Sequence, residues 1–129
     1  MTMWAQRDGV AILMDVLRRG GLPRDMVRVE LPDGWTRHKR PVVTVSDDGT
    51  PTTGRGWTAQ QVRVTVRARD RPTAGALMRQ IDAYLVSPNV RNWAYSIRPA
   101  TGILVANDSR MGGAVGSATY RLATNRSVI

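Results

Sequence analysis

The single histidine, His38, is the first residue whose type suggests catalysis. It lies in the basic stretch Arg37-His38-Lys39-Arg40, directly before Pro41. Neighbouring cations disfavour the imidazolium, so a neutral His38 could act as the general base of a small basic ribonuclease that also uses Arg and Tyr. The alternative is a solvated basic corner on a loop. The chain has no second histidine to supply the matching acid.

Two further motifs match ligand sites only in part. Asp47 and Asp48 form a carboxylate pair that could hold a divalent cation, but no further acids follow at calcium-loop spacing. An Asp-Gly step after a strand is typical of a turn. The segment Gly54-Arg55-Gly56 lacks the glycine and lysine that complete a phosphate-binding loop. Cysteine is also absent, which excludes thiolate chemistry and cysteine-based metal sites. We therefore expect no catalytic set and no metal site among these residues.

After these motifs comes a row of three arginines on one predicted strand: Arg63, Arg67 and Arg69. Between Gln60 and Arg69, small apolar residues alternate strictly with polar ones, which predicts a half-buried strand. With the loop residues Arg55 and Trp57 ahead of it, the row could bind nucleic acid through phosphate pairing and stacking. Its alternative partner is an acidic protein surface, because an RNA-binding sheet normally presents aromatic side chains.

The tryptophans leave two interpretations open. The chain has four of them and no phenylalanine: Trp4, Trp35, Trp57 and Trp93. Tryptophan in a loop is enriched at protein interfaces, because it buries a large area with few rotatable bonds. Alternatively, each folds back over a small core and takes the place of the missing phenylalanine.

The composition favours an anionic partner. The 129 residues include 19 Lys and Arg against 10 Asp and Glu, a net charge of +9. Such an excess on one small domain, here residues 1–129, points to nucleic acid or an acidic protein surface. A GC-rich genome explains the preference for arginine over lysine, but not the net charge. The longest apolar run near the start, Val10 to Met14, is too short for a bilayer or a signal peptide, so we expect synthesis in the cytoplasm.

The first element predicted by the sequence is a helix from Met3 to Arg19. An apolar stripe runs along it at helical spacing, and Gly20-Gly21 ends it. Ile12 and Val16 lie away from that stripe. Either this helix has a second partner, or it is buried more deeply than usual in its own domain.

The remaining segments predict a second helix and a mostly antiparallel sheet. Thr73 can cap that helix, which Ser87-Pro88-Asn89 ends. The stretch Asp47 to Ala59 contains three Gly and one Pro and is expected to form a long loop or a splayed hairpin tip, and Met111 to Gly116 a turn. Two helices on a sheet of four to six strands, in the order helix-strand-strand-strand-helix-strand-strand, make an α+β fold. Strands are expected at Met26–Leu31, Pro41–Ser46, Gln60–Arg69, Trp93–Ile97, Gly102–Ala106 and Ala118–Thr124.

Four features together carry a family resemblance. They are the helix from Met3 to Arg19, the segment PVVTVSDDG, the strand QQVRVTVRARD leading into TAGALMRQIDAYLVS, and the closing GILVANDSRMGGAVGSATYRLATNR. In this pattern the chain resembles the tail terminator (tail completion) proteins of long-tailed bacteriophages. The resemblance covers most of the chain, and the family has no invariant catalytic motif. An arginine-rich composition fits a phage of a GC-rich host.

The resemblance implies a structural virion protein at the neck end of the tail, without enzyme activity, cofactor or membrane partner. Usually six copies form a ring on the tail tube, which ends tube polymerisation and offers a joining face to the head-tail connector or head-closure protein. Identical subunits that close into a ring need two different side surfaces, one for each neighbour. The alternatives are a head-closure component of the neck and a nucleic-acid-binding or ribonuclease-like domain.

Contact residues are expected on this basis. Ile12, Val16 and one edge strand would contact neighbouring copies. The loop from Asp47 to Ala59, with Asp47, Asp48, Arg55 and Trp57, would face the tube or the connector. The row of Arg63, Arg67 and Arg69 would face either DNA passing through the lumen or a neighbouring copy.

Overall fold

A computed structural model of the chain describes residues 3–90 and 94–128. The expected α+β class is confirmed: two helices pack on a mostly antiparallel sheet. In chain order the elements are β1 (Trp4–Ala5), α1 (Gly9–Arg19), β2 (Val27–Arg28), β3 (Val42–Asp47), β4 (Thr52–Thr53), β5 (Trp57–Ala68), α2 (Arg71–Leu85), the 3-10 helix η1 (Pro88–Val90), β6 (Tyr95–Pro99), β7 (Leu104–Asn107), β8 (Ala114–Asn125) and β9 (Ser127–Val128).

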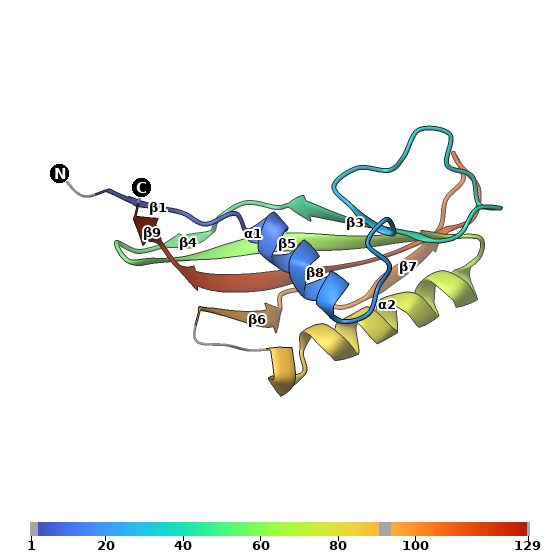
Figure 1. Cartoon of the computed structure of the whole chain (residues 1–129). Coiled ribbons are helices and arrows are strands. Elements are labelled where there is room, and N and C mark those ends of the chain that lie inside the picture. The colour runs from blue at the N-terminus through green and yellow to red at the C-terminus, as the bar shows by residue number, and fades with distance from the viewer. Residues whose placement is uncertain (1–2, 91–93, 129) are drawn as a thin grey trace.

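Two long central strands, β5 and β8, form the axis of the sheet and pair antiparallel along their whole length. On one side β3 and β4 pair with β5, and on the other β6 and β7 pair with β8. β2 adds a short parallel pairing at the outer edge of β3. A helix followed by a hairpin therefore occurs twice, and the two hairpins meet at their second strands (Figure 1).

The described strands of this sheet number seven, rather than four to six, because bulges divide both outer strands. Asp47 lies opposite Val62 and Thr52 opposite Ala59, so five steps on one strand match three on the other. The same shift separates β6 from β7 along β8. Extra residues on one strand of a pair bend it and increase its twist. Each outer strand therefore bends along with the long central pair.

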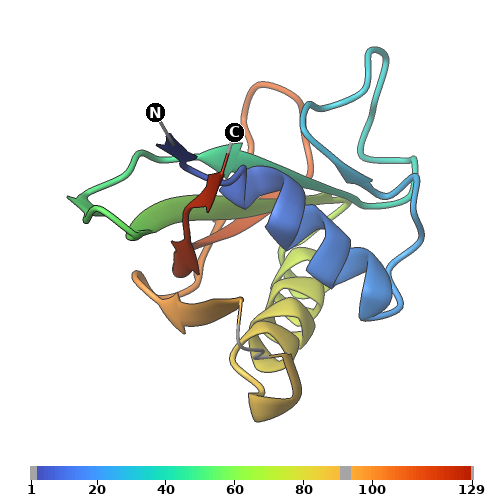
Figure 2. The same ribbon diagram turned by 60° about the vertical axis from the view of Figure 1, so that its left-hand side comes forward.

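Both helices cover the same face of the sheet (Figure 2). Leu13 and Leu17 of α1 and Met78 and Ile81 of α2 belong to one core with the inward residues of β3, β5 and β8. The alternation predicted for β5 is confirmed, because its apolar residues are buried. Val43 and Val45 of β3 are buried as well. The opposite face of the sheet has no helix over it among the described elements.

Helix α1 begins at Gly9 and not at Met3, which corrects the predicted start. The Asp8 side chain accepts a hydrogen bond from the Ala11 amide at 3.1 Å and caps the helix. The buried Gln60 fixes this end to β5, since its Oε1 accepts from the Gly9 amide and its Nε2 donates to the Arg7 carbonyl. Residues 4–5 instead pair with β9.

Helix α2 carries the expected apolar stripe but has a different cap. Asp70, and not Thr73, is the N-cap: its side chain accepts from the Thr73 amide at 2.9 Å. The last turn is followed by Val86 as C-cap, just before Ser87-Pro88-Asn89. The helix packs closely on β8, because a Cβ on Gly116 would lie 3.2 Å from the Ala74 carbonyl oxygen.

Three other expected boundaries change. The strand predicted from Met26 to Leu31 is limited to Val27–Arg28, and Val29 is exposed, so the alternation does not continue beyond β2. The stretch from Asp47 to Ala59 is a bulge followed by a hairpin tip between β4 and β5. Gly116 lies within β8, since the turn before this strand ends at Gly113, where positive φ angles at Gly112 and Gly113 reverse the chain. Trp93, the expected start of a strand, lies outside the described residues.

The two chain ends meet at one end of the molecule. Trp4 lies opposite Val128, and Ala5 opposite Ser127, in a separate antiparallel pair. Figures 1 and 2 both place this pair beside the β4–β5 hairpin. We call β1, β9 and the β4–β5 hairpin together the tip.

Candidate interaction surfaces

Each arginine of the row forms an ion pair with an aspartate, and two of these aspartates come from distant parts of the chain. Arg63 Nε lies 3.0 Å from Asp48 Oδ2, and Arg67 Nη1 lies 2.7 Å from Asp108 Oδ2. Arg69 lies 3.5 Å from Asp70. Each member of the row therefore has a carboxylate partner within its own chain. This pairing reduces the positive potential that the sequence alone suggests for the row.

Asp108 is the most strongly held of these aspartates. Its Oδ1 accepts hydrogen bonds from the amides of Met111 and Arg110, and its Oδ2 accepts from Arg67. These bonds, the amide of Met111 first, hold the pKa of Asp108 below its usual value. The same contacts shape the turn between β7 and β8. Asp108 therefore both stabilises the turn between β7 and β8 and compensates the charge of Arg67.

Asp47 and Asp48 do not converge on a common point for a cation. Asp47 accepts from the Gly49 amide at 2.7 Å, which is a turn contact, whereas Asp48 faces Arg63 and accepts from the Thr119 hydroxyl at 3.3 Å. Within the described residues no three His, Asp or Glu side chains cluster as metal ligands. Asp48 and Arg63 are thus brought together, although nothing in their spacing predicted it.

Ile12 and Val16, which were both expected to contact neighbouring copies, differ in burial. Val16 is 1% exposed and belongs to the core of its own chain, so its side chain is not available to a partner. Ile12 is half-buried and packs against that core. The interpretation of a deeply buried helix is therefore the correct one for Val16.

The described tryptophans also differ in their exposure to solvent. Trp35 is buried, and its Nε1 donates to the Arg40 carbonyl at 3.1 Å, so it folds back over the core. Trp4 and Trp57 are exposed, at 52% and 44%. Trp93 lies outside the described residues.

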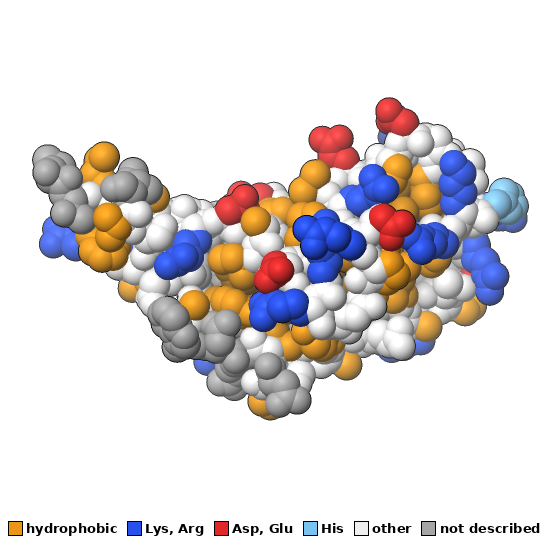
Figure 3. Space-filling model, in the orientation of Figure 1, with side chains coloured by type: hydrophobic (Ala, Val, Ile, Leu, Met, Phe, Trp, Pro, Cys, Tyr) orange, Lys and Arg blue, Asp and Glu red, His pale blue; other side chains and the backbone are white. Residues whose placement is uncertain are grey.

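The tip exposes hydrophobic side chains. Met3, Trp4 and Val128 are each more than half exposed, and Trp57 lies on the neighbouring hairpin (Figure 3). Arg126 holds the two parts together: its guanidinium donates to the carbonyls of Trp4 and Gly54 and to the Thr53 hydroxyl. Sequence reasoning missed the role of Arg126, because its acceptors come from two segments that are both far from it in the sequence.

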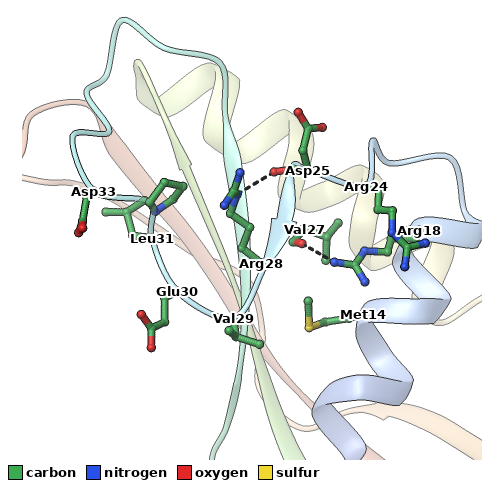
Figure 4. A pocket seen from close by; sticks show the side chains of 11 residues that line it. Met14, Arg18, Arg24, Asp25, Val27, Arg28, Val29, Glu30, Leu31 and Asp33 are labelled. Carbon is green, nitrogen blue, oxygen red and sulfur yellow. Dashed lines mark hydrogen bonds between the residues drawn. The ribbon is translucent and has the colours of Figure 1, made fainter.

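One sheet edge borders a groove of about 520 Å³ between α1 and residues 24–33 (Figure 4). Met14 of α1 and Val29 and Leu31 of the facing segment supply apolar wall. Charged groups surround them, and Arg18 Nη2 donates to the Val27 carbonyl at 2.9 Å. We call this hollow the α1–β2 groove.

The opposite edge of the sheet also carries exposed aliphatic side chains. The bulge between β6 and β7 presents Ile103 and Leu104, the latter 66% exposed. One edge thus borders a groove, and the other carries a bulge.

The far end from the tip is cationic. A hollow of about 590 Å³ is lined by Arg37, His38, Lys39, Arg40, Pro41, Arg69 and Thr73. Lys, Arg and His side chains gather at this end of the molecule (Figure 3). His38 is exposed there and has no carboxylate beside it in the lining.

Comparison with known proteins adds no family to these observations: no family model and no curated protein matches the chain. Across the part of the chain that the structure describes, no helix has the length and apolar character needed to traverse a membrane.

Proposed function

We propose that this protein is a structural ring subunit that ends the tail tube of a long-tailed bacteriophage. The single observation that carries the proposal is the distribution of exposed apolar side chains. Most of them lie at the two sheet edges and the tip, with Val29 and Leu104 on opposite edges and Trp4 at the tip; Val86 and Met111 lie elsewhere. Large exposed apolar side chains grouped in this way are typical of surfaces that bind other proteins.

The two edges supply the different side surfaces that a closed ring needs. In the proposed ring, the bulge before Leu104 of one copy lies in the α1–β2 groove of the next. Because donor and acceptor are different surfaces, the contact is heterologous and closes when the rotation per copy fits. The tip then remains free for a different partner, which we propose to be the tail tube.

Assembly with purified tail-tube protein tests this proposal. The chain is expected to cap the tube and stop its growth, as seen by electron microscopy, with copies joined in a ring. Leu104→Asp is expected to abolish the ring, because it places a charge at an apolar contact. Trp4→Ser with Val128→Ser is expected to leave the ring intact and to prevent capping.

Val86→Asp is the matched control. Val86 is also an exposed aliphatic residue, but it is the C-cap of α2 and belongs to neither an edge strand nor the tip. This variant should assemble and cap as the wild type does. A wild-type chain that leaves tube growth unchanged contradicts the proposal, and if that chain binds the head-tail connector instead, the head-closure alternative is supported.

A further inference from the structure

We infer that the cationic hollow binds the phosphodiester backbone of nucleic acid. This inference goes beyond the proposed ring and can be tested without it. The hollow lies between the loop 37–41 and the junction of β5 with α2, so two segments distant in sequence supply its cations. Its lining, within the described residues, contains four Lys and Arg side chains and His38 but no carboxylate.

Two of the cations in the hollow are not compensated within the described chain. Arg40 pairs with Asp25, and Arg69 pairs with Asp70. No ion pair to a described carboxylate compensates Arg37 or Lys39. An anion that enters the hollow therefore meets cations that no internal partner has already neutralised, in contrast to the arginine row.

The aliphatic part of Arg37 lies close to the turn between β7 and β8. It approaches Gly112 and Gly113 so closely that a Cβ on Gly113 would lie 3.0 Å from Arg37 Cβ. A side chain that is already positioned loses less conformational entropy when it binds. The turn thus restricts the aliphatic part of Arg37, which reduces the conformational entropy that this side chain loses when it binds an anion.

The lining favours phosphates over an acidic protein surface. Binding energy at protein interfaces is concentrated in Trp, Tyr and Arg at a desolvated centre, and the lining of the hollow contains no Trp or Tyr. Guanidinium and ammonium groups are instead suited to phosphate oxygens, which they bind with charge-assisted hydrogen bonds. Contacts of this type position a nucleic acid without reading its bases.

The test measures binding of the full chain to a fluorescent DNA duplex of about two helical turns, by anisotropy, between about 50 and 200 mM salt. The variant Arg37→Gln with Lys39→Gln is expected to bind about tenfold more weakly at the lower salt. Each lost phosphate contact is expected to reduce the slope of log affinity against log salt by about 0.9.

Arg98→Gln with Arg121→Gln is the matched control. It also removes two exposed cations, which face each other across β6 and β8 on the uncovered face of the sheet. Both double variants lower the net charge from +9 to +7, because each loses two cations. The control is expected to bind DNA like the wild type.

Three results would overturn the inference. The first is equal weakening by the two double variants, which would mean that only net charge matters. The second is no DNA binding by the folded wild type at the lower salt. The third is equally tight binding of tripolyphosphate, which would assign the hollow to a small polyphosphate.

Discussion

Tyr120 is the largest fully buried side chain in the core and carries a hydroxyl that needs a partner. Its Oη donates to Asp82 Oδ1 at 2.6 Å, which joins the centre of β8 to α2. Burial, together with this bond, raises the pKa of Tyr120 far above its usual value near 10. The native state therefore retains a proton that the unfolded chain releases at alkaline pH.

Tyr120→Phe is expected to lower the free energy of unfolding by about 1–2 kcal/mol at pH 8, because Asp82 loses a hydrogen bond. The difference in free energy of unfolding should shrink above pH 10. There the titration of Tyr120 lowers the stability of the wild type by about 1.4 kcal/mol per pH unit, and the Phe variant lacks this loss. Denaturant unfolding at pH 8 and pH 11 measures both effects. Tyr84→Phe, at a half-buried tyrosine, is the control, and a gap that stays constant with pH would disprove the linkage.

At the scale of elements, the contact between α2 and β8 depends on a missing side chain. Gly116→Val would place methyl groups where Ala74 and Met78 already lie, each 3.2 Å from the Cβ position. The expected loss of stability is about 1–3 kcal/mol, typical of overpacking. Thermal or denaturant unfolding measures it. Gly102→Val, where a Cβ meets nothing within 4 Å, should stay near the wild type. Similar losses in both variants would argue against a steric cause.

At the scale of the whole molecule, Arg126 couples the chain ends to the β4–β5 hairpin. Arg126→Ala is expected to leave the main sheet intact and to loosen the tip, because the carbonyls of Trp4 and Gly54 lose a donor. Hydrogen exchange should speed up at the amides of Gly54 and Arg126 but not in the centre of β5. Arg55→Ala removes another cation of the same hairpin and is the control. Unchanged exchange in Arg126→Ala would show that β1–β9 pairing alone holds the tip.

The sequence by itself determined the features that depend on near neighbours. The alternation of β5, the apolar stripe of α2 and the α+β order follow from side-chain periodicity, which reports which face of an element is buried. Glycine likewise predicted the end of the first helix at Gly20-Gly21, where the Gly20 amide donates to the Val16 carbonyl. Such patterns span only a few residues, so they can be recognised in the sequence before the fold is known.

The tertiary structure decided which distant residues meet. Arg63 and Arg67 look like free cations until strand register and loop path bring Asp48 and Asp108 beside them. The burial of Val16 depends on how α1 lies on the sheet, which its own period does not specify. The tip and the cationic hollow each join segments far apart in the chain. Charge compensation and surface shape depend on distances in space, and only the packed fold sets those distances.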